Sequence, residues 1–90
     1  MAYSLDSTPQ FDKYFKKLDK QSQENIANYI RKKLVNIENP RSIGKPLKGN
    51  LQGLWRYRIG DYRLICQIQD QKLIILAVEI AHRKEVYKGK

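Results

Sequence analysis

Residues 54–68 read LWRYRIGDYRLICQI, two alternating runs separated by Gly60-Asp61. In the first run every second residue, beginning with Trp55, is aromatic or aliphatic, and arginines occupy positions 56 and 58 between them. Alternation with a period of two predicts a β-strand with one apolar face. Gly60-Asp61 is typical of the tight turn of a β-hairpin. We therefore expect an antiparallel hairpin whose second strand covers residues 62–68.

The arginines of this hairpin are expected on one face. Arg56 and Arg58 share a face by alternation, and Arg63 lies just across the turn, where the second strand would pair. Each of them alone is typical of a solvated strand surface. Like charges opposite each other destabilise an antiparallel pair, whereas the planar guanidinium binds phosphate oxygens in bidentate geometry and keeps its charge. The cluster therefore predicts a site where three guanidiniums meet one phosphate.

Working outward, Asp70-Gln71 predicts a second turn, and residues 72–81 form a nearly continuous apolar run typical of a strand covered on at least one face. Cys66 is the only cysteine and lies within the second strand of the hairpin. It is expected as a core thiol rather than a nucleophile, and a single cysteine forms no intrachain disulfide. A single cysteine in the core and the lack of an intrachain disulfide both favour a reducing compartment.

Upstream of the hairpin, residues 2–6 alternate as a short strand, and Thr8-Pro9 suits a helix start with Thr8 as cap. Apolar spacing predicts a first helix through Leu18 and a second one, capped by Asp19 or Ser22, that ends near Pro40. The second helix would bury Ile26, Tyr29, Ile30, Leu34 and Ile37. Core rather than interface positions are expected for Phe11, Tyr14 and Tyr29.

The segment 40–53 is rich in Gly, Pro, Ser and Asn and carries Lys45 and Lys48, which predicts an irregular basic loop. The fold class is therefore α+β in one domain of residues 1–90: an N-terminal strand, a two-helix hairpin, and an antiparallel three-strand meander (β-α-α-β-β-β). The net charge is +9, from 18 basic and 9 acidic residues. Such a surface attracts phosphate backbones, and it equally suits an acidic protein partner.

Several function classes lack their motifs. Gly44, Gly49 and Gly53 match no phosphate-binding loop, and one histidine with one cysteine supplies no zinc shell. No serine lies in a Gly-x-Ser-x-Gly elbow, so acyl-transfer hydrolysis is unsupported. The N-terminus lacks a signal pattern and the longest apolar run, residues 73–77, is too short for a bilayer span, so a cytoplasmic protein is expected.

In three runs the chain resembles toxins of the RelE/ParE superfamily, on the RelE side: PLKG at 46–49, LWRYRIGDYRL at 54–64 and HRKEVY at 82–87. The resemblance covers nearly the whole chain and includes the element order. It implies the toxin of a type II toxin–antitoxin module, a ribosome-dependent endoribonuclease (mRNA interferase) that cleaves mRNA in the A site by attack of a 2′-hydroxyl on the adjacent phosphate. It implies no cofactor, no metal and no membrane, an acidic RelB-like antitoxin as partner, and operator DNA contact only through that antitoxin.

The resemblance also implies roles for individual residues. Arg56 and Arg58 fall where RelE has two lysines, Arg63 and Arg83 match its catalytic arginines, Tyr87 matches its tyrosine, and Lys48 matches a basic loop residue. Arg63 with Arg56 and Arg58 would hold the scissile phosphate, Arg83 would sit by the leaving oxygen, and Tyr87 would stack on a base or orient the sugar. Lys45 and Lys48 would join Arg56 and Arg58 in binding RNA.

The proton-transfer group stays open, because arginine keeps its proton in proteins. His82 is the only side chain that titrates near neutrality without perturbation, and it is the candidate acid or base. Glu79 and Glu85 are weaker candidates, and a strand-end histidine bonded to backbone is the structural alternative. Two other functions remain: ParE-like inhibition of DNA gyrase on the same scaffold, and noncatalytic RNA or ribosome binding.

Overall fold

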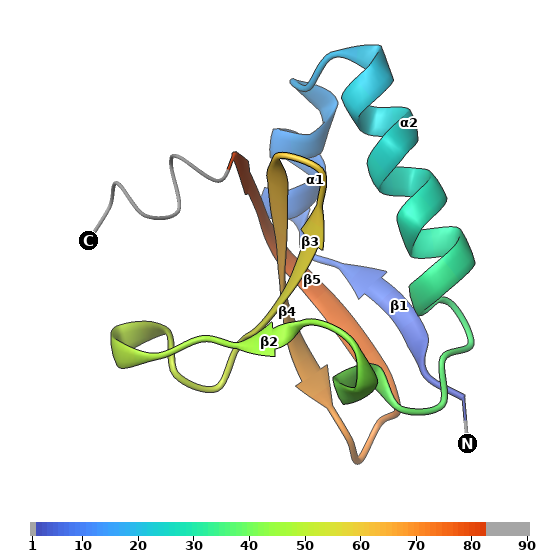
Figure 1. Cartoon of the computed structure of the whole chain (residues 1–90), viewed down its shortest axis with the longest axis vertical. Helices are drawn as coiled ribbons and strands as arrows, with labels where there is room; N and C mark the ends of the chain where they lie inside the picture. The colour runs from blue at the N-terminus through green and yellow to red at the C-terminus, as the bar shows by residue number, and fades with distance from the viewer. Residues whose placement is uncertain (1, 83–90) are drawn as a thin grey trace.

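The protein pairs a helical hairpin with a five-stranded sheet (Figure 1). The computed structural model describes residues 2–82. The sheet order is β1-β5-β4-β3-β2, with β1 parallel to β5 and the other neighbours antiparallel. The predicted α+β order is confirmed, with a short edge strand added. The elements are β1 (Ser4–Ser7), α1 (Pro9–Lys16), α2 (Lys20–Tyr29), β2 (Lys45–Pro46), β3 (Trp55–Ile59), β4 (Tyr62–Gln69) and β5 (Ile74–His82).

Both helices begin at side-chain caps. The Thr8 hydroxyl accepts a hydrogen bond from the Phe11 amide at 3.1 Å, and Pro9 occupies the first turn of α1. The Asp19 carboxylate accepts one from the Ser22 amide at 3.1 Å, so Asp19 caps α2. Each cap satisfies an amide that the first helical turn leaves without a partner. The start of α1 is therefore confirmed, and of the two candidates for the second cap the structure selects Asp19.

The second helix is shorter than predicted. After α2 the chain makes one π-helical turn, Ile30–Leu34, and then leaves the helix, with Asn36 in the left-handed region at φ 67°. The Asn36 amide donates to the Tyr3 carbonyl at 3.1 Å, which draws the chain toward the N-terminal strand. The expected continuation to Pro40 is therefore wrong. Similarly, Leu73 is left-handed at φ 56°, so β5 starts two residues later than predicted.

The segment 40–53 is more regular than predicted. It contains two short 3-10 turns, Pro40–Ser42 and Gly49–Leu51, and strand β2 between them. Two side chains of β3 hold it in place: the buried Tyr57 hydroxyl donates to the Pro40 carbonyl at 2.7 Å, and the Trp55 indole donates to the Ile43 carbonyl at 2.8 Å. These tertiary bonds turn an irregular sequence into an edge strand.

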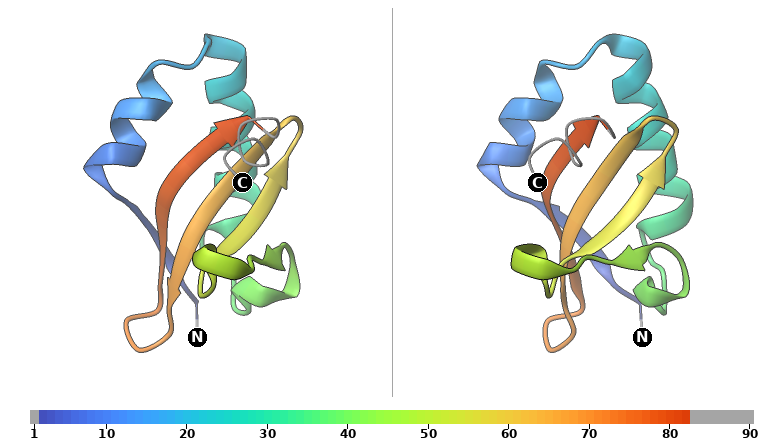
Figure 2. Two further views of the ribbon diagram at one scale, coloured as in Figure 1. Left: turned by 90° about the vertical axis from the view of Figure 1, so that its left-hand side faces the viewer. Right: turned by 60° about the vertical axis from the view of Figure 1, so that its left-hand side comes forward.

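Both helices lie on the same face of the sheet (Figure 2). Between helices and sheet lies a core that includes the fully buried Ile26, Leu34, Tyr57, Leu64, Ile75 and Ile80. Cys66 belongs to it, and burial raises the pKa of its thiol to about 12, so the prediction of a core thiol is confirmed. Neither helix in residues 2–82 is long and apolar enough to cross a membrane.

The prediction of core positions for three aromatic side chains holds fully for one of them and in part for a second. Phe11 is buried and stacks on Phe15 at 5.8 Å, and the half-buried Tyr29 packs at a tilt against Tyr57. Tyr14 is 38% exposed, so its core prediction is wrong. The buried stripe of α1 follows Phe11 and Phe15, and Tyr14 falls at the margin of that stripe.

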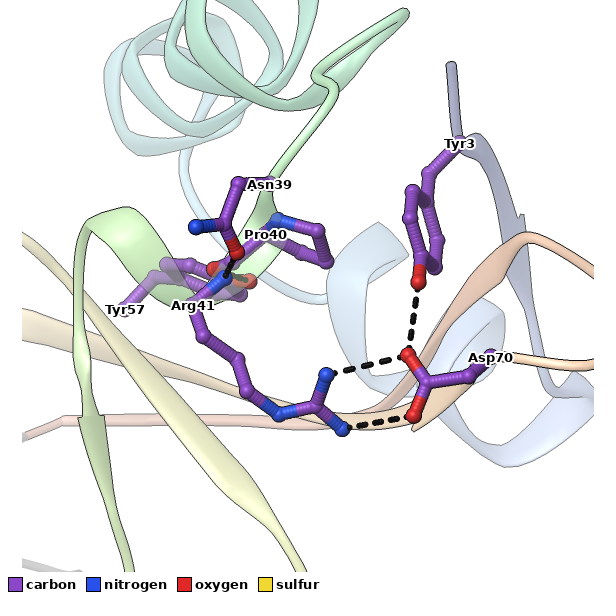
Figure 3. A network of polar contacts seen from close by, with 6 residues as sticks. All are labelled: Tyr3, Asn39, Pro40, Arg41, Tyr57 and Asp70. Atoms are coloured by element: carbon purple, nitrogen blue, oxygen red, sulfur yellow. Dashed lines mark hydrogen bonds and ion pairs between the residues drawn. The ribbon is translucent and has the colours of Figure 1, made fainter. Parts of the chain in front are cut away.

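Three segments meet around Asp70 in the β4–β5 turn (Figure 3). The Asp70 carboxylate accepts two hydrogen bonds from the Arg41 guanidinium at 2.9 and 3.0 Å, and one from the Tyr3 hydroxyl at 2.6 Å. These bonds lower the pKa of Asp70 and raise that of Tyr3. They tie the N-terminal segment and the 40–53 segment to the sheet at the end opposite the β3–β4 turn.

Candidate nucleic-acid interface

The β3–β4 register places the hairpin arginines on one face. Arg58 lies directly opposite Arg63, and Arg56 lies opposite Ile65. Tyr57 and Leu64, the residues between them in the pleat, are buried in the core on the helix side. Because successive side chains of a strand alternate, the arginines project from the other face. The predicted convergence of three arginines on one sheet face is therefore found in the structure.

The flanking strands extend this arginine face. Lys45 of β2 lies opposite Arg56, Glu79 of β5 lies opposite Ile65, and Ala81 lies opposite Arg63. Two cross-strand rows result, Lys45–Arg56–Ile65–Glu79 and Arg58–Arg63–Ala81. The first row runs from an edge lysine to a carboxylate on β5. Lys48 is exposed and lies beyond β2, where it precedes the Gly49–Leu51 turn, so it is not part of either row.

Burial distinguishes the arginines of this face. Arg63 on the central strand is only 4% exposed, Arg56 is partly buried and Arg58 is exposed. Arginine stays charged in every protein environment, and a charge shielded from water acts on an anion more strongly than an exposed one. Arg63 is therefore the strongest electrostatic centre of the face, and Arg58 is its solvent-facing partner.

His82 lies on the other face of the sheet. It is the cross-strand partner of Tyr62, and the two rings meet edge to face at 5.6 Å and 76°. Tyr62 in turn pairs with Ile59 on the helix side. Of the candidate proton-transfer groups, the structure brings Glu79 to the arginine face and does not bring His82 there. Arg83, Glu85 and Tyr87 lie outside the described residues.

Two hollows border the arginine face. One of about 520 Å³ lies between α1 and β5, and Tyr14 and Glu79 are among its lining residues. A smaller one of about 290 Å³ is lined by Tyr29, Gly44, Lys45, Arg56 and Arg58. Tyr29 was not among the sequence-predicted site residues, because its helical spacing matches the buried stripe of α2. No signal in the periodicity distinguishes a core tyrosine from one that lines such a hollow.

The described residues supply no metal centre. Within residues 2–82, no group of three or more His, Cys, Asp or Glu side chains lies close enough together to hold an ion. The chemistry that the arginine face offers is electrostatic: fixed positive charge from Lys45, Arg56, Arg58 and Arg63, with one carboxylate, Glu79, at its far side.

The fold is shared with a structurally known toxin–antitoxin system. A chain of the toxin–antitoxin complex RelBE2 from Mycobacterium tuberculosis superimposes with a TM-score of 0.81 at 25% identity, covering 92% of this chain and 93% of that chain. Residues 5–87 match the family model described as the ParE toxin of the type II toxin–antitoxin system, parDE. The chain therefore belongs to this toxin family, within the RelE/ParE superfamily.

Two curated relatives fall on the RelE side. The chain is 30% identical over 92 residues to the mRNA interferase toxin RelE of Escherichia coli (strain K12). This alignment covers 97% of this chain and 92% of that protein. It is 38% identical over 52 residues to Toxin RelE of Mycobacterium tuberculosis, covering 58% of this chain and 54% of that protein. The matched segment thus spans about half the length of the mycobacterial toxin.

Proposed function

We propose that this chain is the toxin of a type II toxin–antitoxin module and that it acts as a RelE-type mRNA interferase, an endoribonuclease that cleaves mRNA in the ribosomal A site. The observation that carries the proposal is the cross-strand pair of Arg58 and the buried Arg63, with Arg56 and Lys45 on the same face. Membership of the toxin family and similarity to a relative named as an mRNA interferase support it.

In the reaction a ribose 2′-hydroxyl gives its proton to a general base and its oxygen attacks the adjacent phosphorus. The bond to the 5′-oxygen breaks and this oxygen takes a proton from water, which leaves a 2′,3′-cyclic phosphate and a 5′-hydroxyl. Negative charge builds on the phosphoryl oxygens in the pentacoordinate transition state. Arg63, with Arg58 and Arg56, supplies fixed positive charge where this charge develops, and preorganised charge of this kind usually contributes more to catalysis than any other single effect. Outside the described residues, Arg83 would neutralise the leaving oxygen and Tyr87 would stack on a base.

Proton transfer is assigned to Glu79 in preference to His82. A general base must reach the proton that it removes, and Glu79 shares the arginine face whereas His82 lies on the opposite face. Glu79 and Arg63 are diagonal neighbours on adjacent strands, a relationship that places their backbone positions about 7–8 Å apart.

The partner is an acidic, RelB-like antitoxin. A net charge of +9 favours an acidic protein, and the structural neighbour described above comes from a toxin–antitoxin complex. In this proposal operator DNA is bound by the antitoxin, and the toxin contributes no DNA contact of its own. Lys45 and Lys48 bind the RNA backbone.

The proposal is tested by primer extension on a translated reporter mRNA, with and without ribosomes. Wild type and Lys72→Ala, which removes an exposed lysine of the β4–β5 turn, should produce ribosome-dependent cuts. Arg63→Ala should abolish them while retaining ribosome binding. Intact mRNA in the presence of the folded wild-type protein and ribosomes would refute the proposed endoribonuclease activity.

A second candidate is ParE-like inhibition of DNA gyrase, because the matching family model carries the ParE description. Growth arrest with intact mRNA would point to it, and a gyrase supercoiling assay with the purified protein would test it. The noncatalytic alternative, RNA or ribosome binding alone, predicts that Arg63→Ala weakens binding modestly, in proportion to charge, with no cleavage in either protein.

A further inference from the structure

The smaller of the two hollows lies at the edge of the sheet, where β2 ends and β3 itself becomes the edge strand. Strand β2 pairs only with Trp55 and Arg56, so within residues 2–82 the segment 57–59 of β3 has no strand on that side. Tyr29, at the end of α2, packs against β3 from the helix side, and Arg58 projects from the other side. The hollow, here called the edge cleft, is lined by Tyr29, Gly44, Lys45, Arg56 and Arg58.

One lining residue of the edge cleft, Gly44, has no side chain. At Gly44 φ is +80°, and a Cβ there would lie 2.4 Å from the Arg56 carbonyl oxygen and 2.6 Å from the Trp55 indole nitrogen. Only glycine therefore allows the 40–53 segment to lie this close to β3. The close approach sets Lys45 opposite Arg56.

The aromatic wall of the edge cleft is held by packing. The Tyr29 ring lies 6.5 Å from the buried Tyr57 ring, tilted by 50°, and Tyr57 is itself anchored to the Pro40 carbonyl. The Tyr29 hydroxyl is neutral at physiological pH, as an ordinary tyrosine is, and partial burial raises its pKa further. The cleft thus combines one fixed, uncharged aromatic side chain with three cations.

We propose that the edge cleft holds the nucleotide that flanks the scissile phosphate, with its base stacked on Tyr29 and its own phosphate bound by Lys45. The inference rests on the function proposed above. Arg58 connects the two sites, because it lines the edge cleft and is also the cross-strand partner of Arg63. An RNA strand that crosses the arginine face from β4 to β3 would enter the cleft next.

The composition of the cleft favours single-stranded RNA over an acidic peptide. An acidic peptide would satisfy the cations but would make no use of the aromatic side chain beside them. Aromatic rings next to a positively charged groove are the means by which proteins bind unpaired nucleotides, and every base can stack. The cleft therefore contributes affinity and register along the RNA, with little preference among bases.

The test is single-turnover cleavage on programmed ribosomes, with toxin concentration varied to separate the half-saturating concentration from the maximal rate. Tyr29→Leu should raise the half-saturating concentration about tenfold, the usual effect of losing one base–aromatic stack, and leave the maximal rate nearly unchanged. Tyr29→Phe should behave as wild type. Lys45→Ala should raise the half-saturating concentration and reduce the salt-dependence slope by about one. Lys72→Ala is the charge-matched control.

A second series uses mRNAs with a single abasic residue at each nucleotide beside the cut. At one of these positions the abasic residue should raise the half-saturating concentration of the wild type about tenfold and leave that of Tyr29→Leu unchanged, because the stack is already absent. This comparison reports the stack itself, and thermal unfolding checks that each variant is folded. If Tyr29→Leu does not fold, Tyr29→Met takes its place in both series.

The outcomes separate the two proposals. Suppose that the wild type cleaves mRNA on ribosomes and that Tyr29→Leu and Lys45→Ala have the same half-saturating concentration as Lys72→Ala. This result overturns the proposed nucleotide site in the edge cleft and leaves the proposed endoribonuclease activity in place. Equal abasic effects in wild type and Tyr29→Leu also overturn it. If the wild type does not cleave at all, the endoribonuclease fails and the inference fails with it.

Discussion

Arg58 of β3 and Arg63 of β4 are direct cross-strand partners on the arginine face. Like charges in this position repel each other, so the hairpin concentrates positive charge at the centre of the proposed site. An anion between the two guanidiniums would be attracted by both and would offset their repulsion. The relationship therefore links stability to ligand binding and can be measured without knowing the substrate sequence.

Removing one member of the pair should stabilise the free protein. Arg58→Gln is expected to raise the free energy of unfolding by about 0.2–1 kcal/mol at low salt. Inorganic phosphate should stabilise the wild type and have little effect on the variant, as measured by urea unfolding. Lys72→Gln serves as control for net charge. A destabilised Arg58→Gln, or equal phosphate effects in both proteins, would contradict the anion site.

The placement of the two proton-transfer candidates predicts unequal effects on cleavage. Glu79→Gln should lower the maximal rate by about 10²–10⁴-fold, the usual contribution of general acid–base catalysis, and should alter the pH profile of the rate. His82→Gln should retain most of the rate, because its side chain lies on the opposite face beside Tyr62. Single-turnover cleavage across pH checks both variants, and the reverse ranking would return the role to His82.

The close approach at Gly44 predicts a stability difference between two glycines. Gly44→Ala and Gly49→Ala both place a Cβ at positive φ, +80° and +67°, which costs about 1–2 kcal/mol for an ordinary residue. Only at Gly44 would the new Cβ also meet neighbouring atoms. Gly44→Ala should therefore be clearly the more destabilised in urea unfolding, and should also weaken RNA binding because Lys45 moves. Equal losses of stability in the two variants would show that the 40–53 segment shifts without cost to make room for the new Cβ at Gly44.

The Asp70 network predicts loss of stability in acid. Hydrogen bonds from Arg41 and Tyr3 hold the pKa of Asp70 below its ordinary value of 3.8, so folding favours the carboxylate. Its contribution is present above that value and is lost as the pH falls through the lower folded pKa. Asp70→Asn should be less stable than wild type at neutral pH, with the difference disappearing in acid. Glu24→Gln, at an exposed helix position, should show no such trend.

The buried thiol predicts low reactivity. Cys66 is fully buried and its pKa is raised to about 12, so the thiolate is scarce at neutral pH and reagents cannot reach it. Labelling by a disulfide reagent should be slow in buffer and fast in denaturant. Because the reagent reaches the thiol only when the core opens, the labelling rate should follow the unfolding equilibrium. Rapid labelling of the native protein would place Cys66 outside the core.

Much of the fold follows from local sequence. Period-two alternation and Gly60-Asp61 determine the hairpin, and Thr8 and Asp19 determine the helix starts, because each of these signals acts within a few residues. The convergence of Arg56, Arg58 and Arg63 also follows from alternation plus a tight turn. The end of the second helix could not be predicted, since it depends on a bond from Asn36 to the distant Tyr3.

The sequence alone therefore determined the first strand, the starts of both helices, the hairpin with its arginine face, and the order of these elements, because strand alternation and helix caps depend on neighbouring residues. Tertiary structure decided three things: that β2 forms and brings Lys45 opposite Arg56, that Glu79 and not His82 shares the arginine face, and that Tyr29 lines a cleft. Each depends on the register or packing of segments far apart in the chain. Composition and periodicity do not predict these contacts, because they form only when the chain folds around its core.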